Sequence, residues 1–316
     1  MTPPLGRAAA PRFVYGPVPS RRLGYSLGVD LLPRKRCSFD CVYCQVGRTT
    51  RTTVRRRDFY PVAEVLGQVR AALGSGKTID CVTLSGTGEP TLYRSLGPLI
   101  RRIKTMTDVP VAVLTNGSLL FRKAVRRGLA EADIVIPTLD AADQAMLDRV
   151  NRPNTALRFD RLVRGLKAFR VEFPGRIWLE VMLVKGMNDR PEHLRRLKTL
   201  VEALSPDRVQ INTVVRPPAE KTAKPLSRAE LERARALLGS ASEIIADFRK
   251  TDRRRGRALR DEDVLAVLKR RPVTLRDLAA SLGRPAREIR TRLRALIRRG
   301  RAARVSHKGR AFFEAR

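Results

Sequence analysis

Cysteine is scarce in this chain of 316 residues, which contains only four. Three of the four lie close together in the sequence, so a framework of disulfide bonds is not expected. Long hydrophobic runs are also missing, because no uninterrupted apolar stretch approaches the ~20 residues that a membrane span needs. Residues 1–6 lack the basic and then apolar pattern of a secretion signal. We therefore expect a cytoplasmic protein with no membrane contact.

Histidine, a common metal ligand, occurs only twice. His193 falls in a segment with helical spacing, and His307 falls in a predicted turn. Neither histidine has a candidate metal ligand near it in the sequence. We therefore predict that both lie at the surface.

Acidic residues are the third shortage. The chain has 31 Asp or Glu against 65 Lys or Arg, which gives a formal net charge of +34. Such an excess favours polyanionic partners, chiefly nucleic acid, because basic side chains neutralise phosphates and release counterions. The alternative is a compositional bias toward arginine, since the basic residues are spread along the whole chain. Only a local pattern can decide between the two interpretations.

The three clustered thiols are Cys37, Cys41 and Cys44, and they directly follow an apolar run at residues 27–32. Thiolates suit an iron–sulfur cluster or zinc, and both normally take four protein ligands. The fourth cysteine, Cys81, lies far away in a run that reads as a buried strand. Three cysteines would leave one iron of a cluster open to a non-protein ligand. A structural zinc loop and a redox-active group of thiols are the alternatives.

The spacing C-x-x-x-C-x-aromatic-C, with Tyr43 in the aromatic place, resembles the cluster loop of the radical S-adenosylmethionine (radical SAM) superfamily. The resemblance implies a [4Fe-4S] cluster on the three cysteines and S-adenosylmethionine (SAM) on the unique iron. It also implies reductive cleavage of SAM to a 5′-deoxyadenosyl radical that abstracts hydrogen from a substrate. An electron donor such as flavodoxin or ferredoxin would then be needed.

Six strand-like apolar runs alternate with segments of helical spacing, which predicts a parallel sheet of right-handed βαβ units. The fold class is therefore α/β. The expected strands are residues 27–32, 79–84, 111–115, 134–139, 177–184 and 209–214. The family resemblance implies that this sheet curves into a partial (β/α)6 barrel. In parallel α/β barrels the ligand site lies at the C-terminal ends of the strands.

The second of these strands ends in a glycine-rich stretch that resembles the family's motif for the SAM amino group. The residues are Ser85, Gly86, Thr87, Gly88, Glu89 and Pro90. Glycines let the backbone approach a ligand closely, and a carboxylate can accept hydrogen bonds from an ammonium group. A plain turn is the alternative interpretation.

Polar residues at the ends of two later strands, and within two more, are further candidates for the SAM site. Asn116, Thr138 and Asp140 resemble positions of the radical SAM enzymes of molybdenum-cofactor biosynthesis, where they would meet the carboxylate and ribose of SAM. Asn116 could instead belong to a turn, and Asp140 could cap a helix. Glu180 and Asn212 are candidates to line the site. Because an unpaired buried charge is costly, Glu180 must either point out of the sheet or have a partner in the barrel.

A narrower resemblance covers about residues 12–248. The stretches 19–24, 37–50, 151–153 and 216–218 together look like a group of iron–sulfur oxidoreductases similar to the wyosine-forming tRNA-modification enzymes. The archaeal wyosine-forming enzymes carry a second cluster on upstream cysteines, whereas this chain has no cysteine before Cys37. The wyosine reaction itself is therefore not carried over.

The sequence divides into four parts. We predict an N-terminal extension at residues 1–25, a radical SAM core barrel at 26–248, a basic linker at 249–257 and a small basic domain at 258–316. The last part has three short helical segments followed by a hairpin signal, an order that resembles a winged helix-turn-helix. Residues 257–316 contain eighteen Lys or Arg against six Asp or Glu.

The third helical segment of this domain supplies the local pattern of charge. Its apolar residues cluster on one side of a helix, and Arg287, Arg290, Arg294 and Arg298 form a separate stripe. Such a stripe suits phosphate contacts by a recognition helix, with tRNA or another RNA as the expected partner and DNA less favoured. The alternative is a solvated basic face on a domain that docks a protein or a substrate.

Three functions therefore stay open from the sequence. The first is a radical SAM enzyme that acts on RNA, as in tRNA modification. The second is a regulator in which the cluster senses redox state or SAM while the last domain binds nucleic acid. The third is a radical SAM enzyme that acts on a peptide or a small metabolite.

Overall fold

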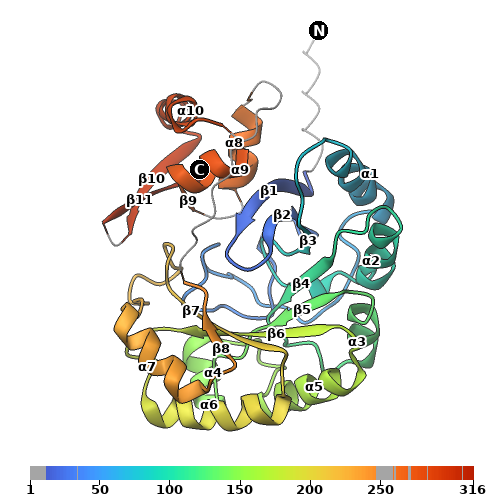
Figure 1. Ribbon diagram of the computed structural model, residues 1–316, viewed down its shortest axis with the longest axis vertical. Helices are drawn as coiled ribbons and strands as arrows, with labels where there is room; N and C mark the ends of the chain where they lie inside the picture. The colour runs from blue at the N-terminus through green and yellow to red at the C-terminus, as the bar shows by residue number, and fades with distance from the viewer. Residues whose placement is uncertain are drawn as a thin grey trace.

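The computed structural model describes residues 12–33, 35–246, 259, 261–269, 272–282, 284–307 and 309–316. Its larger part is a mixed α/β fold around one eight-stranded sheet, in which the spatial order of the strands follows the sequence (Figure 1). The strands are β1 (Val14–Ser20), β2 (Gly24–Val29), β3 (Cys81–Leu84), β4 (Val111–Thr115), β5 (Ile134–Pro137), β6 (Arg176–Leu183), β7 (Arg208–Thr213) and β8 (Ser242–Ile244). β1 is antiparallel to β2, and every later neighbouring pair is parallel.

Helices follow the strands along the outer side of this sheet (Figure 1). They are α1 (Val62–Leu73), a short 3-10 helix (Pro90–Leu92), α2 (Leu96–Lys104), α3 (Lys123–Leu129), α4 (Gln144–Val150), α5 (Phe159–Glu172), α6 (Pro191–Leu204) and α7 (Arg228–Leu238). α6 starts with proline, whose missing N–H and fixed φ suit the first turn of a helix. α7 is preceded by its N-cap Ser227, which forms a capping box with Glu230.

The two faces of the sheet bury different residues. On β6, Leu179 and Val181 belong to the main core between the sheet and the helices. Trp178 belongs to a small second cluster with Cys81 and Ala112 on the inner face. Because side chains alternate along a strand, Glu180 shares the inner face with Trp178. The sheet curves around that inner face as a partial barrel, and among the described strands β1 and β8 form its two edges (Figure 1).

All six strands expected from the sequence are present, with shifts of up to three residues at their ends. The two edge strands were not expected. Residues 14–20, assigned above to an N-terminal extension, form β1 and pair with β2. Residues 242–244 form β8 and pair with β7. Helices α3 and α4, each of seven residues, were also missed.

The described residues from 259 onward form a separate unit, here called the C-terminal module. Its elements are α8 (Asp261–Leu268), β9 (Val273–Thr274), α9 (Leu275–Leu282), α10 (Ala286–Arg298), β10 (Ala302–His307) and β11 (Arg310–Ala315). The three strands form one antiparallel sheet in the order β10-β11-β9, over a hydrophobic core of the module's own. The three helices and the hairpin were expected, whereas β9 was not. The predicted linker at 249–257 lies outside the described residues.

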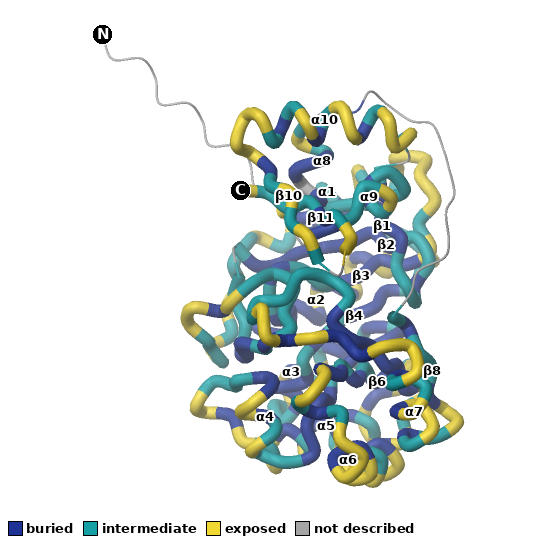
Figure 2. Tube along the Cα trace, turned by 90° about the vertical axis from the view of Figure 1, so that its left-hand side faces the viewer, coloured by how far each residue is buried: buried dark blue, intermediate teal, exposed yellow. Residues whose placement is uncertain are grey.

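The C-terminal module lies beside the open edge of the barrel. Its helix α9 packs against β1. Arg12, just before β1, donates to the Glu262 carbonyl and the Asp263 carboxylate, both at 3.0 Å. At the tip of the hairpin, the ring of His307 is hydrogen-bonded to the Val214 carbonyl at 3.1 Å. Figure 2 shows the module above the sheet, with α10 along its far side. In the described part of the chain, no helix combines the length and apolarity needed to cross a bilayer.

Candidate functional site

The three cysteines lie on an irregular segment after β2, residues 37–44, here called the three-cysteine loop. Backbone hydrogen bonds join it to the last residue of α4 and to the segment that follows. The Val42 amide donates to the Val150 carbonyl at 3.0 Å, and the Asn154 amide donates to the Ser38 carbonyl at 2.8 Å. The loop's own Asp40 accepts a hydrogen bond from the Thr49 amide at 2.5 Å. Hydrogen bonds along its length thus fix the three-cysteine loop to neighbouring segments of the chain.

The thiols of this loop are close enough to influence one another electrostatically. Burial raises the pKa of Cys37 to about 12, with a further contribution from the nearby Glu89 carboxylate. Burial also raises the pKa of Cys41 well above its usual value, and Cys37 and Cys44 add to this shift. Binding an iron–sulfur cluster therefore requires the loss of tightly held protons, as is general for thiolate ligands. Cys81 is buried on β3, away from the loop.

Two asparagine side chains donate hydrogen bonds to sulfurs of the loop. The Asn116 Nδ2 lies 3.5 Å from the Cys37 Sγ and 2.8 Å from the Ser38 Oγ. The Asn151 Nδ2 lies 3.5 Å from the Cys41 Sγ. The other end of the Asn151 amide, its Oδ1, is buried without a hydrogen-bond partner among the described residues. Amide donors stabilise thiolate charge, and a buried free acceptor suits a ligand that carries N–H or O–H groups.

Asp140, a predicted SAM contact, is hydrogen-bonded to the three-cysteine loop. Its carboxylate accepts from the Tyr43 hydroxyl, from the Asn151 Nδ2 at 2.8 Å and from the Met182 amide at 2.8 Å. Burial raises the pKa of Asp140 to about 7, although these hydrogen bonds oppose the shift. Burial and the neighbouring Asp140 raise the pKa of Tyr43 well above its usual value, so its hydroxyl stays protonated and donates. The structure therefore joins the predicted residues Tyr43 and Asp140 in one network.

The glycine-rich stretch at residues 85–90 packs against the chain that leads into the three-cysteine loop. A Cβ on Gly88 would lie 1.7 Å from the Arg36 carbonyl oxygen, and one on Gly86 would lie 2.1 Å from the Asp30 Cγ. Ser85 lies 3.3 Å from the Tyr15 hydroxyl, and the Thr87 amide donates to Asp30 at 3.1 Å. Both glycines are thus needed for a close approach to the protein's own chain.

Glu89 joins the ends of β3 and β4. Its Oε1 accepts from the Thr91 amide at 3.0 Å and from the Thr91 and Thr115 hydroxyls, both at 2.6 Å. Its Oε2 accepts from the Asn116 amide at 2.7 Å. Burial raises the pKa of Glu89, while these hydrogen bonds oppose the shift. Three donors share the Glu89 Oε1 and one binds Oε2, so only Oε2 has an acceptor position left. A contact of Glu89 with an ammonium group therefore stays a prediction.

Glu180 and Asn212 lie on the inner face, and their partners come from the turn between β1 and β2. The Arg22 Nη1 lies 2.7 Å from the Glu180 Oε2, and the Arg21 Nη1 donates to the Asn212 Oδ1 at 2.7 Å. The Asn212 Nδ2 donates to the Glu180 Oε1 at 2.8 Å. Of the two arrangements expected for Glu180, the structure has the one with a partner in the barrel. Thr138 is half-buried beside it, in a bridge with Glu180.

Several residues of this region were missed or misplaced by the sequence interpretation. The narrower resemblance includes Asn151, Arg21 and Arg22, but the sequence predicts no role for them. His193 was expected at the surface, but it is buried and its ring is hydrogen-bonded to the Asp140 carbonyl at 3.2 Å. That prediction was wrong because His193 lies on the buried face of α6.

The predicted arginine stripe lies on α10. Arg287, Arg290, Arg294 and Arg298, here called the basic stripe, are all exposed. Ile289, Leu293 and Leu296 on the other side of α10 are buried in the module's core. The guanidinium groups of the stripe form no hydrogen bond or ion pair with the described residues.

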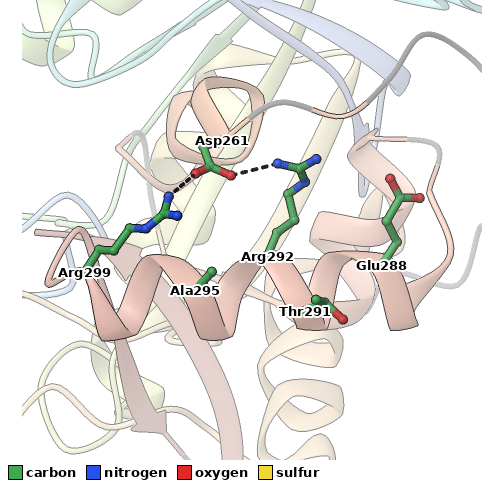
Figure 3. Close-up of a pocket in the computed structure, with 6 residues that line it drawn as sticks. All are labelled: Asp261, Glu288, Thr291, Arg292, Ala295 and Arg299. Carbon is green, nitrogen blue, oxygen red and sulfur yellow. Dashed lines mark hydrogen bonds and ion pairs between the residues drawn. The ribbon is translucent and has the colours of Figure 1, made fainter.

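A different face of α10 carries arginines that are neutralised. Asp261 of α8 accepts from Arg292 at 3.0 Å and from Arg299 at 3.1 Å, beside a cavity of about 400 Å³ (Figure 3). Figure 3 shows the two guanidinium groups converging on this carboxylate from either side. The arginines of α10 thus divide into a paired face and the unpaired basic stripe.

Comparisons with known proteins agree with this architecture. Residues 31–198, more than half of the chain, match the family model of the radical SAM superfamily. A protein of Brachyspira hyodysenteriae named GTPase Obg is 39% identical over 291 residues, which are 91% of this chain and 43% of that protein. The chain thus spans less than half the length of this relative. A UPF0026 protein of Methanocaldococcus jannaschii is 36% identical over 233 residues, 73% of this chain and 71% of that protein.

Among solved structures, the crystal structure of a radical SAM methyltransferase from Sphaerobacter thermophilus is similar, with a TM-score of 0.52 and 20% identity. The match covers 69% of this chain and 65% of that one. At this level of identity the likeness concerns the fold.

Proposed function

The chain belongs to the radical SAM superfamily of iron–sulfur enzymes, which use a [4Fe-4S] cluster and SAM, and on that premise we propose that Cys37, Cys41 and Cys44 hold the cluster. The observation that carries the proposal is the arrangement around these thiols. They lie on one loop, and two of their sulfurs accept hydrogen bonds from asparagine amides. Cys81 lies apart on β3, so it supplies no fourth ligand.

SAM takes the open coordination position in this proposal. The bound cofactors supply the reductive cleavage of SAM to a 5′-deoxyadenosyl radical that abstracts hydrogen from the substrate. The chain's own residues shape the site. Glu89 fixes the ends of β3 and β4, and the Asn151 Oδ1 is the buried acceptor left for the ligand. In this proposal, Gly86, Thr138 and the other strand-end residues predicted from the sequence contact the bound SAM.

Anaerobic reconstitution of the cluster, followed by reduction in the presence of SAM, tests this proposal. We expect 5′-deoxyadenosine by mass spectrometry, and we expect Cys41→Ala to lose iron and activity. Cys81→Ala is the matched control, because it removes a thiol of the same barrel and should keep the iron content. No 5′-deoxyadenosine from the wild type, together with unchanged iron in Cys41→Ala, would refute the assignment.

For the substrate we propose RNA, bound in part by the C-terminal module. The element order of the module, helix-strand-helix-helix-hairpin, is the order of a winged helix-turn-helix, and α10 corresponds to its recognition helix. The exposed, unpaired basic stripe suits phosphate contacts. A low-potential donor such as flavodoxin or ferredoxin would supply the electron. The likeness to wyosine-forming enzymes stays a prediction, and no wyosine reaction is proposed.

The RNA that co-purifies at low salt tests the substrate class. We expect RNA recovered with the wild-type chain to be depleted from a variant in which the four arginines of the basic stripe are replaced by alanine. Equal recovery of RNA from the wild type and the variant would show that the basic stripe of α10 does not bind RNA. Absence of RNA from both proteins would leave a peptide or a small metabolite as the substrate of the same radical chemistry.

A further inference from the structure

A cavity of about 680 Å³ lies where the partial barrel is open, between the barrel and the C-terminal module. We call it the lateral cavity. Pro19 of β1 and Ala246, just after β8, line it from the two edges of the sheet. The start of α9 and the start of β11 line it from the module. Since the sheet does not close between β1 and β8 in the described chain, this cavity lies over the side opening of the barrel.

The wall of the lateral cavity is strongly basic. Four arginines from four segments contribute to it, namely Arg21, Arg216, Arg276 and Arg310, against the single carboxylate of Asp277. Arg276 and Arg310 are exposed, and their side chains form no ion pair or hydrogen bond with the described residues. Arginines from separate segments around one cavity attract an anion, and guanidinium matches the geometry of phosphate oxygens.

The first turn of α9 adds to the same potential. Leu275 and Arg276, its first two residues, line the cavity. The backbone amides at a helix start have no partner within the helix and carry a partial positive charge. Of the nearby amides, that of Asp277 is satisfied by the Thr274 hydroxyl at 3.1 Å. The helix start therefore reinforces a site that four arginine side chains already define.

The other two arginines connect the lateral cavity to the interior. Arg21 donates to Asn212 on the inner face of β7 at 2.7 Å. Arg216 donates to the Oε1 of Gln45 at 3.1 Å, and Gln45 directly follows Cys44 of the three-cysteine loop. A group bound at Arg21 and Arg216 would thus contact side chains that are hydrogen-bonded to Asn212 in the barrel interior and to Gln45 beside the three-cysteine loop.

We propose that the lateral cavity binds a phosphate group of the substrate, held between the edge of the sheet and the C-terminal module. The inference rests on the proposed function in taking the substrate to be RNA. A free nucleotide offers the same phosphate chemistry, and the test separates the two sources.

The test compares Arg276→Ala/Arg310→Ala with Arg102→Ala/Arg127→Ala in the full-length holoenzyme. Arg102 and Arg127 lie on α2 and α3, in the outer layer of helices and apart from the module (Figure 1), and both are exposed without a side-chain partner among the described residues. The control therefore removes the same charge from a similar environment. The probes are a fluorescein-labelled single-stranded RNA, read by anisotropy at several salt concentrations, and AMP, read by calorimetry.

We expect the cavity variant to bind one or both probes at least tenfold more weakly, while the control variant loses threefold or less. For RNA, the slope of log affinity against log salt should shrink by about 0.7 for each lost phosphate contact. A loss for RNA alone identifies the source as RNA, and a loss for AMP identifies a nucleotide. The variant Arg276→Lys/Arg310→Lys keeps the charge, so it should recover part of the affinity. This recovery would show that the loss in the alanine variant does not come from a folding defect.

Equal losses in the cavity and control variants, or no loss for either probe, would overturn the proposal. These results do not depend on SAM cleavage, which the 5′-deoxyadenosine assay measures separately on the wild type. Failure of the lateral cavity as a phosphate site is therefore distinguishable from failure of the radical SAM assignment.

Discussion

The side-chain amide of Asn151 lies 3.5 Å from the Cys41 sulfur and 2.8 Å from the Asp140 carboxylate. One amide thus touches both a proposed cluster ligand and the acid that accepts from Tyr43. Hydrogen bonds to ligand sulfurs are one of the factors that set the reduction potential of an iron–sulfur cluster. Donors stabilise the reduced, more negative state more than the oxidised state.

Replacing Asn151 by leucine should therefore lower the midpoint potential of the cluster. One hydrogen bond to a charged group is worth about 1.5 kcal/mol, which corresponds to at most about 65 mV for one electron. We expect a shift of a few tens of millivolts in that direction, measured by electron paramagnetic resonance during a redox titration. Asn154→Leu is the control, because Asn154 contacts Thr52 and no sulfur. An unchanged or raised potential in Asn151→Leu would contradict the role of this amide.

The side chains that contact the three cysteines could not be predicted from the sequence. The cysteine spacing predicts the loop because its ligands are local. Asn151 contacts Cys41 across 110 positions in the sequence, and Arg22 contacts Glu180 across 158. Such contacts depend on how the strands are arranged in space, so no sequence pattern within one segment can predict them. The sequence could state only that a buried Glu180 needs a partner.

The fold was predictable where burial is uniform. The central strand β4 is apolar from residue 111 to 114, and its bounds match the prediction. The edge strand β1 contains Pro17 and Pro19, which a central strand would not tolerate but an edge strand can. β8 has only three residues, so it is too short to give a periodic signal. The two edges were missed for these reasons, and they flank the side opening.

The ion pair of Arg22 and Glu180 should matter for stability. Both side chains are nearly buried, with exposed fractions of 10% and 13%. Removing one partner of a buried pair leaves an uncompensated charge and costs about 3–5 kcal/mol. We expect Arg22→Met to lower the unfolding free energy by about that amount in urea denaturation. Arg22→Met/Glu180→Gln should recover part of the loss, and a double variant as unstable as the single one would show that the charge is not responsible.

The same pair predicts a pH dependence with a defined sign. Burial by itself would raise the pKa of Glu180, but Arg22 and Asn212 outweigh it, so the pKa lies below the usual value of 4.5. A carboxylate with a lowered pKa stabilises the fold above its unfolded pKa and loses this contribution as pH falls through its folded pKa. The difference in unfolding free energy between wild type and Glu180→Gln should therefore be constant near pH 7 and shrink below about pH 4.5. A difference that grows on acidification would contradict this sign.

Gly88 should not tolerate any side chain. A Cβ at this position would lie 1.7 Å from the Arg36 carbonyl oxygen, which is backbone and is itself bonded to the Glu89 amide. The backbone would have to move, and overpacking of this kind costs about 1–3 kcal/mol or more. We expect Gly88→Ala to lower the unfolding free energy by at least that amount and to reduce the iron bound after reconstitution.

Gly67→Ala is the matched control for this prediction. Gly67 lies inside α1, and a Cβ added there would have no neighbouring atom within 4 Å outside its own helical turn. Alanine has a higher helix propensity than glycine, so this variant should be about 0.5–1 kcal/mol more stable. If Gly88→Ala and Gly67→Ala had the same stability and iron content, the close approach of Gly88 to Arg36 would not be needed for folding or for cluster binding.

The basic stripe allows a quantitative prediction about RNA. Arg290 and Arg294 are neighbours on α10, both exposed, whereas Arg292 and Arg299 are held by Asp261. We expect Arg290→Ala/Arg294→Ala to weaken the binding of a single-stranded RNA and to reduce the salt slope by about 1.4, for two lost phosphate contacts. Arg292→Ala/Arg299→Ala removes the same formal charge from the paired face, so its salt slope should change less. If both variants had the same slope as the wild type, the stripe would face a partner other than nucleic acid.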